Sequence, residues 1–414
     1  GFSNPAKVHL YGYGGHLQNE VLFAGEEYDD MVEVPLYYSS KLDAWLFWGN
    51  GLISWNGDER ITNFYAKNAY YFLSEEDTDA TPIGTEPSFT GRCDTVFTNF
   101  TDHVLHERDE YAWYHGGRSL FENTNYANNN SHTYSLQTID PEFEDNGTRL
   151  KVVFSASNNT PTKMTTTVNG TQMGTMSLLP TEIYIYGTAA TATYDLSKLE
   201  HTNNWSVRLT STAGENARLD YLSLSYKRKL KPSSGYVAFT QIQPEVADSI
   251  LEAEGPGRSR FDIEGTGLKV MRLGRPGNPA TLIEGTQNGS SYSVVVEDPT
   301  LQYVAFDDSY AFPEPSYVGV VANQDLHALD SVDMVVIIPT SGKLLDQAKR
   351  LVEAHEQYDG LRCAIVYANL IYNEFSSGTP DATAYRRLMK MLYDRAETTD
   401  DAPKYLLLFG LFAH

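Results

Sequence analysis

Residues 371–396 read IYNEFSSGTPDATAYRRLMKMLYDRA and indicate how the C-terminal part of the chain folds. The stretch predicts a turn followed by a helix from Pro380 to about Arg395. Thr379 can accept hydrogen bonds from the first free N–H groups of this helix, and Pro380 suits its first position, where no N–H is needed. An apolar face at helical spacing supports the helix. This face consists of Tyr385, Leu388, Met389 and Leu392.

The segments on either side of this helix complete an α/β pattern. Residues 335–338 and 363–366 are continuous apolar runs, which is typical of strands covered on both faces. A helix is predicted between them at 344–352, and a third strand at 406–409. The order βαβαβ predicts a parallel sheet with right-handed crossovers. No glycine fingerprint opens the first helix, so a dinucleotide site is not expected.

The rest of the chain is predicted to be mainly β. Trp205, Val207 and Leu209 alternate with polar residues, as do the apolar residues of 222–226, so one face of each strand should be buried and the other wet. We therefore expect a multidomain, mainly β fold that ends in a partial α/β domain. The expected parts are a β-rich domain at 1–88, a β-sandwich or jelly roll at 89–231, a further β region with Gly and Pro loops at 232–312, and the α/β part at 313–414.

Composition excludes several classes of function. The chain has 414 residues and a net charge of −23, because 54 acidic residues outweigh 31 basic ones. This charge argues against binding of nucleic acid and against docking on anionic lipid. No apolar run is long enough to span a membrane. The two cysteines, Cys93 and Cys363, do not make a disulfide framework. Cys363 lies in an apolar strand pattern and is predicted to be a buried, unpaired thiol.

Three residues are candidates for a functional role, although none is predicted to be catalytic or to bind a cofactor or a metal ion. His327 ends the segment NQDLH (323–327) and is expected to hold a loop where the first strand of the α/β part begins. Glu374 and Asp381 flank the turn in residues 371–381. Asp381 is expected to stabilise the start of a helix, where acidic residues are favoured. For Glu374 a functional role stays open, namely that of a carboxylate near the face that carries the active site.

A group of imidazoles offers an alternative site. His103, His106, Glu107 and His115 occur close together, and His103 and His106 would share one face of a helix and hold a metal ion. The competing interpretation is a polar strand and loop with imidazoles at the surface, and we favour it.

Seven segments, in this order along the chain, resemble the gingipain-like cysteine peptidases and, within them, the PorU-type sortases of the type IX secretion system. They are YGYGG (11–15), FYAKNAYYFL (64–73), LDYLSLSYKRKL (219–230), YVAFDD (303–308), NQDLH (323–327), IYNEFSSGTPDATAYR (371–386) and YLLLFG (405–410).

The resemblance implies a caspase-like α/β domain in a peptidase on the cell surface or outer membrane. Such an enzyme cleaves C-terminal sorting signals from secreted cargo and joins the cargo to lipopolysaccharide by thiolate attack assisted by a histidine. Its implied partners are the cargo and components of the secretion system. In this family a Gly-Asp-Gly loop follows the strand, and the catalytic His and Cys lie further along. Here Leu411 follows Gly410, so the chain by itself is expected to be inactive.

Two other functions remain open. The first is a cell-surface adhesion or carbohydrate-binding protein, because jelly rolls often hold glycans. It would require a concave face with two or more exposed aromatic residues. The candidate residues are Trp45, Trp48, Trp55, Trp113 and Trp205. The second is a hydrolase that uses Cys363, which would require a histidine close to the thiol.

Overall fold

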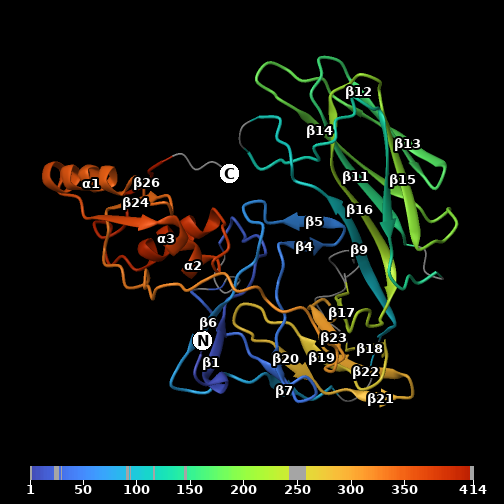
Figure 1. Cartoon of the computed structure of the whole chain (residues 1–414), viewed down its shortest axis with the longest axis horizontal. Helices are drawn as coiled ribbons and strands as arrows, with labels where there is room; N and C mark the ends of the chain where they lie inside the picture. Colours follow the sequence, from blue (N-terminus) through green and yellow to red (C-terminus); the bar gives the residue numbers. More distant parts are fainter. Residues whose placement is uncertain are drawn as a thin grey trace. The chain divides into compact units, whose positions relative to one another are not determined.

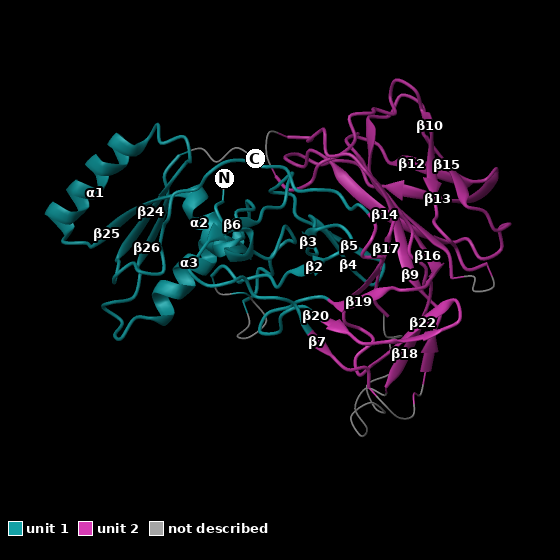
Figure 2. Cartoon of the chain, turned by 60° about the horizontal axis from the view of Figure 1, so that its bottom comes forward, with its two compact units in different colours: residues 1–84, 273–281, 311–414 teal, residues 85–272, 282–310 magenta. Residues whose placement is uncertain are grey.

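The chain forms a multidomain, mainly β structure with a small α/β part, as the sequence predicts (Figure 1). The computed structural model describes residues 2–22, 28, 30–89, 93, 95–114, 117–143, 147–241 and 258–410. Two compact units are present (Figure 2). They comprise residues 1–84, 273–281 and 311–414, and residues 85–272 and 282–310. The domain boundaries expected at 88, 231 and 312 stay predictions. In the described ranges, no helix is long and apolar enough to cross a membrane.

The α/β part of the first unit contains a parallel three-stranded sheet with the strand order β25-β24-β26. Its strands are β24 (Met334–Ile338), β25 (Cys363–Tyr367) and β26 (Tyr405–Leu408). Its helices are α1 (Leu345–Asp359), α2 (Ala368–Phe375) and α3 (Thr383–Asp394). The chain passes from the central strand β24 to β25 at one edge of the sheet and then to β26 at the other edge. Right-handed crossovers in these two directions place α1 on one face of the sheet and α2 and α3 on the other.

The central strand is buried on both faces, as its continuous apolar sequence predicts. Val335 and Ile337 pack in a core with α2 and α3. Met334, Val336 and Ile338 pack in a second core with residues of α1. Successive side chains of a strand point to opposite faces, so one short strand serves both cores.

The stretch 371–396 differs from the sequence-based prediction at its start. Residues 371–375 belong to α2 instead of a turn, and α3 begins at Thr383 instead of Pro380. The reason is local, because Asp381 Oδ1 accepts a hydrogen bond from the backbone N of Thr383 at 2.8 Å. The predicted cap, Thr379, instead donates its hydroxyl to the backbone oxygen of Gly14 at 3.4 Å. The apolar face of α3 is confirmed, with buried residues that include Leu388 and Leu392.

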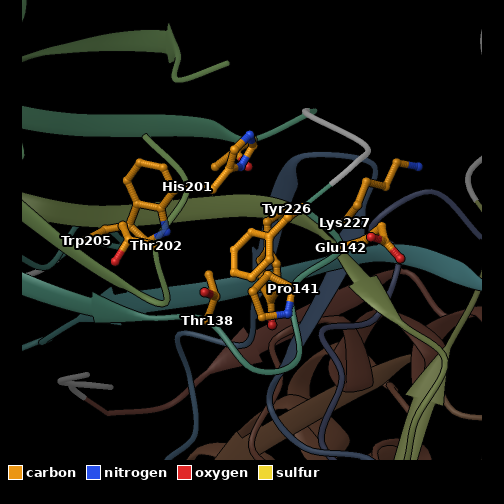
Figure 3. Close-up of a pocket in the computed structure, with 10 residues that line it drawn as sticks. Thr138, Pro141, Glu142, His201, Thr202, Trp205, Tyr226 and Lys227 are labelled. Atoms are coloured by element: carbon orange, nitrogen blue, oxygen red, sulfur yellow. The ribbon is translucent and has the colours of Figure 1, made fainter. Parts of the chain in front are cut away.

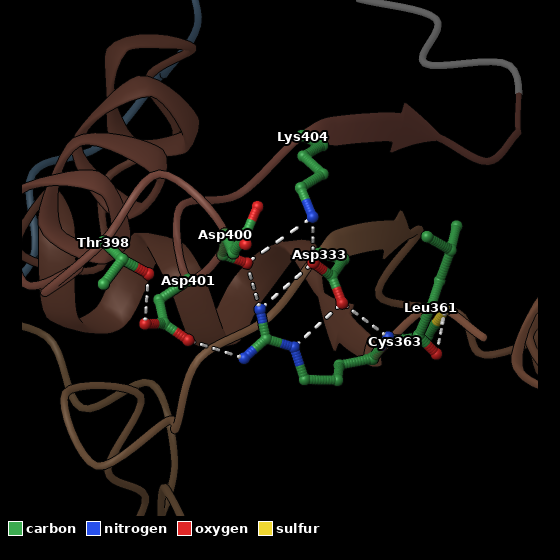
Figure 4. Close-up of polar contacts among 8 residues, drawn as sticks. Asp333, Leu361, Cys363, Thr398, Asp400, Asp401 and Lys404 are labelled. Atoms are coloured by element: carbon green, nitrogen blue, oxygen red, sulfur yellow. Dashed lines mark hydrogen bonds and ion pairs between the residues drawn. The ribbon is translucent and has the colours of Figure 1, made fainter.

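A charged cluster ties the amino ends of the three parallel strands together (Figure 4). The buried carboxylate of Asp333 accepts hydrogen bonds from the backbone N and the Nε of Arg362, both at 2.8 Å. Lys404 Nζ donates to the same carboxylate at 3.0 Å. Arg362 also pairs with Asp401 at 3.1 Å. Since hydrogen bonds from the Arg362 side chain favour the ionised form, the pKa of Asp333 lies well below its usual range.

The second unit contains the predicted β-sandwich, which is built from two antiparallel four-stranded sheets with the orders β10-β15-β12-β13 and β14-β11-β16-β9. The strands are β9 (Asn99–Glu107), β10 (Ser131–Gln137), β11 (Arg149–Ala156), β12 (Thr162–Val168), β13 (Thr171–Leu178), β14 (Thr188–Asp195), β15 (Asn204–Ser211) and β16 (Ala217–Lys229). Both sheets contribute to one core, which includes Leu150, Val207 and Leu222.

The expected alternation holds in β15 and fails in β16. In β15, Trp205, Val207 and Leu209 are buried, with exposed residues between them and the half-buried Thr210 after them. In β16, Ser223 and Ser225 are buried as well, although they were expected to face solvent. β16 is an inner strand with β11 and β9 on its two edges, so its small serine side chains are shielded on the outer face too.

The further β region forms two more sheets, with the strand orders β17-β23-β19-β20-β7 and β21-β22-β18-β8. The strands are β7 (Gly84–Glu86), β8 (Thr95–Phe97), β17 (Tyr236–Phe239), β18 (Ser259–Glu264), β19 (Lys269–Arg272), β20 (Thr281–Ile283), β21 (Thr286–Asn288), β22 (Ser291–Val296) and β23 (Tyr303–Phe306). Phe239, Phe261 and Tyr303 pack together in their core.

The N-terminal region is β-rich, as expected, but its sheets are small. A short 3₁₀ helix at Pro5–Lys7 is followed by three two-stranded antiparallel pairs, β1-β6, β2-β3 and β4-β5. The strands are β1 (Val8–Tyr11), β2 (Tyr37–Ser39), β3 (Ala44–Leu46), β4 (Ile53–Asn56), β5 (Glu59–Thr62) and β6 (Phe72–Glu75). The long connection between β1 and β2 contributes to the candidate site.

Candidate functional site

The segment after β1 packs against the turn between α2 and α3. The backbone N of Tyr13 donates to Ser377 Oγ at 3.1 Å, and Gln18 Nε2 donates to the backbone oxygen of Phe375 at 2.9 Å. The approach is close at Gly12, where a Cβ atom would lie 2.5 Å from Ser377 Oγ and where φ is +127°. Only glycine adopts this backbone conformation without strain. Two segments more than 350 positions apart are thus held in direct contact.

Arg387 is the centre of this contact. Its guanidinium is buried and donates from Nη1 to the backbone oxygen of Phe375 at 2.9 Å, to Tyr13 Oη at 3.1 Å and to Gln18 Oε1 at 3.1 Å. Nη2 donates to the backbone oxygen of Tyr28. Burial raises the pKa of Tyr13 to about 12, so its hydroxyl stays protonated near neutral pH. The buried guanidinium is thus hydrogen-bonded to neutral acceptors. This arrangement suits a structural role of Arg387 better than a role in proton transfer.

Asp381 belongs to the same contact. Its Oδ2 accepts from the backbone N of Gln18 at 3.0 Å, while Oδ1 accepts from the backbone N of Thr383. Burial raises the pKa of Asp381, against the opposing effect of these hydrogen bonds. Asp381 therefore orders the start of α3 and anchors the N-terminal segment at once. Its partners are different from those of the other two candidate residues.

Glu374 and His327 are brought together. His327 Nδ1 donates to Glu374 Oε2 at 2.8 Å. The Glu374 carboxylate is buried and accepts twice from the backbone N of Leu326, at 2.8 and 2.9 Å, and once from Gln324 Nε2 at 2.7 Å. Asn373 Nδ2 in turn donates to Gln324 Oε1 at 2.9 Å. The segment 323–327 and helix α2 are thereby linked through one carboxylate.

The His327 ring is oriented from several sides. It stacks on Phe375 with ring centroids 4.8 Å apart and planes at 14°. Arg395 donates to its backbone oxygen, which fixes the loop. Asp30 Oδ2, from the N-terminal segment, lies 3.9 Å from His327 Nδ1. The ligand atoms of Asp30, His327 and Glu374 all lie within 4.8 Å of one another, so these three residues could hold a metal ion.

This cluster could be predicted from the sequence only in part. Gln324 lies inside the segment NQDLH, and its side chain supports Glu374 directly. Arg387 lies within residues 371–396, but nothing in the sequence marked it as a candidate functional residue. Asp30 could not be found from sequence, because only the fold brings residues 30 and 327 together. Sequence reasoning predicted no metal ligand here, and this prediction is not tested by the structure.

The histidines of the second unit lie on a strand, which agrees with the interpretation that we favoured. His103 and His106 belong to β9 and are separated by three positions, so they point to opposite faces and cannot share a helical one. Both are half-buried, whereas we expected them at the surface. The His106 ring packs on Tyr134 with centroids 4.8 Å apart, and its Nε2 lies 3.6 Å from Glu122. His115 lies outside the described residues.

Of the five candidate tryptophans, all of which the structure describes, Trp45 alone is exposed, beside Tyr38, so the tryptophans by themselves do not form a face of two or more exposed aromatic residues. Trp205 is buried in the sandwich core, and Trp113 is half-buried and donates to Ser155 Oγ at 2.9 Å. A pocket beside Trp205 has a volume of only about 10 Å³ (Figure 3). This is room for about one water molecule and far too little for a sugar. Carbohydrate binding is therefore not favoured.

Cys363 is free but only half-buried, in contrast to the predicted full burial. In the described part of the sheet, β25 is an edge strand, so one side of the thiol is less covered than in a central strand. Its Sγ lies 3.9 Å from the backbone oxygen of Leu361. Burial, then the charges of Glu356 and Asp333, raise the pKa of the Cys363 thiol. These are the opposite of the conditions that activate a nucleophilic cysteine.

Comparison with known proteins agrees with the fold and the resemblance. Residues 327–412 match the profile of Peptidase family C25. None of the curated proteins matches the chain. The structure is similar to the crystal structure of dimeric latent PorU from Porphyromonas gingivalis, with a TM-score of 0.80 and 24% identity. This match covers 99% of the present chain and 39% of that one, so the chain spans well under half of the length of the solved protein.

Two carbohydrate-binding modules also match, but weakly. One is the CBM36-1 domain of a multidomain xylanase from the hindgut metagenome of Trinervitermes trinervoides, with 15% identity, 30% of this chain and 95% of that chain covered, and a TM-score of 0.20. The other is a family 35 module from Clostridium thermocellum, with 16% identity, coverage of 30% and 90%, and a TM-score of 0.19. At these scores the likeness carries no argument.

The fold defines a class of protein, namely a mainly β chain with a caspase-like α/β part at its C-terminal side. Within this class, the whole chain has the fold of PorU, and the predicted resemblance to the gingipain-like peptidases is confirmed in residues 327–412.

Proposed function

We propose that this chain is part of a gingipain-like cysteine peptidase that acts as a PorU-type sortase. The observation that carries the proposal is the combination of two matches, the family C25 profile at 327–412 and the PorU fold over 99% of the chain. The ordered series of sequence segments supports the same assignment.

In this proposal the whole protein cleaves secreted cargo at its C-terminal sorting signal. A cysteine thiolate attacks the scissile carbonyl, a thioester forms, and the sorting signal leaves with a new amino terminus that takes its proton from a histidine. A nucleophile then attacks the thioester and releases the cargo, which in the surface-anchored form of the reaction becomes joined to lipopolysaccharide. The protein would act outside the cytoplasm, at the cell surface or outer membrane, with cargo and secretion components as partners.

The present chain would supply the support for this chemistry. In a doubly wound domain the functional loops lie beyond the carboxyl ends of the strands. The charged cluster around Asp333 ties the opposite, amino ends of the strands together. The contact at Arg387 ties α3 to the end of α2 and to the N-terminal segment. We assign His327, Glu374 and Asp381 to this support rather than to proton transfer.

The proposal is tested with the protein that carries this chain and a reporter that ends in a sorting signal. We expect cleavage at the signal that iodoacetamide abolishes, and no cleavage of a matched reporter without the signal. Equal cleavage of both reporters would contradict a sorting role. Cleavage that resists the thiol reagent would contradict a cysteine peptidase.

A further inference from the structure

We propose that Asp30, His327 and Glu374 form a binding site for one divalent transition-metal ion of the zinc type, which links the N-terminal segment to the α/β part. The inference rests on these three residues and is independent of the proposed peptidase activity.

The donor set suits such an ion. One imidazole nitrogen and two carboxylate oxygens are ligands that zinc takes in proteins, usually with a water molecule in the fourth position. Calcium and magnesium prefer oxygen atoms alone, so the imidazole of His327 favours a transition metal over both.

The distances require a rearrangement that falls mainly on Asp30. Zinc lies about 2.0–2.2 Å from N and O ligands, which places two ligand atoms of a tetrahedral site about 3.3 Å apart. His327 Nδ1 lies 2.8 Å from Glu374 Oε2 and 3.9 Å from Asp30 Oδ2. The first separation must open and the second must close, each by about half an ångström. The third separation, between Asp30 and Glu374, is within 4.8 Å and must close by up to about 1.5 Å. Asp30 can supply most of this movement, because its side chain is 53% exposed.

The two inner ligands are already held in place. The Glu374 carboxylate is oriented by the backbone N of Leu326 and by Gln324 Nε2, and the His327 ring by its stacking on Phe375. Such supporting contacts are typical of metal sites, where they fix the orientation of the ligands. The ion would replace one hydrogen bond, from His327 Nδ1 to Glu374, and would leave the other bonds of Glu374 intact.

The test is calorimetric titration of zinc chloride into the untagged 414-residue chain after removal of metal with a chelator. We expect one site. His327→Gln removes the central ligand and should weaken zinc binding by about a hundredfold or more, and Asp30→Asn by about tenfold. Because Asp30 is exposed, Asp30→Asn leaves the fold intact and keeps the test valid even if the other variant is less stable.

Matched controls come from α1, where His355 Nδ1 lies 2.7 Å from Asp359 Oδ2 on the surface. His355→Gln and Asp359→Asn should bind zinc as the unchanged chain does. The proposal is overturned if the unchanged chain takes up no zinc at about 0.1 mM, a weak limit for a three-ligand site. It is equally overturned if Asp30→Asn and His327→Gln both bind zinc with unchanged affinity.

Discussion

The three buried carboxylates of Asp333, Glu374 and Asp381 have different roles because they have different neighbours in space. A sequence does not show these neighbours. Asp333 lies between Arg362 and Lys404, which hold its pKa low. Asp381 meets mainly backbone N–H groups, and burial raises its pKa. Glu374 binds the segment 323–327. The sequence singled out Glu374 and Asp381 from their places beside a turn, but not Asp333, because a lone acid before an apolar strand carries no signal.

Asp333→Asn is expected to destabilise the chain by about 2–3 kcal/mol at pH 7, because it leaves Arg362 and Lys404 without their shared carboxylate. The free energy of unfolding in urea measures this loss. Asp359→Asn, at an exposed pair on α1, is the control and should change stability by less than about 0.5 kcal/mol. Equal effects of the two substitutions would contradict the account of the charged cluster.

The same variant predicts a pH dependence. Since the pKa of folded Asp333 is lowered, its contribution is present above the unfolded value of about 3.9 and is lost as the pH falls through the folded pKa. The stability difference between the unchanged chain and Asp333→Asn should therefore be constant from about pH 7 to 5 and close below about pH 4. A difference that closes already near pH 6 would point to another group.

Among the elements of the α/β part, the strands and the longer helices α1 and α3 were predictable, and the short helix α2 was not. The continuous apolar runs predicted β24, β25 and β26, but only β24 is buried on both faces. In the described sheet β25 and β26 are edge strands, so β25 is half-buried and β26 is largely exposed, in contrast to the burial that we expected. Helix α2 was missed because residues 371–375 are too few to show a helical period and lead into Ser, Ser and Gly. The start of α3 was misplaced because Asp381, and not Thr379, accepts the hydrogen bond from the backbone N of Thr383 at the start of the helix.

Gly12→Ala tests the contact between the N-terminal segment and the turn after α2. The added Cβ would meet Ser377 Oγ at 2.5 Å, in a backbone conformation that alanine rarely adopts. We expect a loss of about 1–3 kcal/mol in the free energy of unfolding. Gly51→Ala is the matched control, because a Cβ at Gly51 meets no atom within 4 Å. No difference between the two variants would show that the contact is not tight.

The reactivity of Cys363 tests its place at the start of β25. With its pKa raised by burial, the thiol should react with a disulfide reagent at pH 7 about tenfold more slowly than free cysteine, or slower still. The rate is measured in a Cys93→Ser variant, and addition of denaturant should restore the rate of a free thiol. Rapid labelling in the native state would count against this environment.

At the scale of the whole molecule, local patterns predicted the order of the parts, and only the fold reveals their contacts. The α/β part follows the mainly β part of the chain, as the sequence indicates, and the overall fold matches PorU. The contacts of Tyr13 with the turn after α2 and of Gln18 with α3 join segments that no local pattern relates. The cluster of Asp30 with His327 was hidden for this reason.

We propose that this chain supports a thiol-dependent sortase and does not supply its nucleophile. The direct measurement is the rate of reporter cleavage by the protein that carries this chain, with Cys93→Ser and Cys363→Ala combined. We predict a rate within about twofold of the unchanged protein, still abolished by iodoacetamide, because Cys363 lies at the amino end of β25 with a raised pKa. Loss of cleavage in a variant that remains folded would contradict the account.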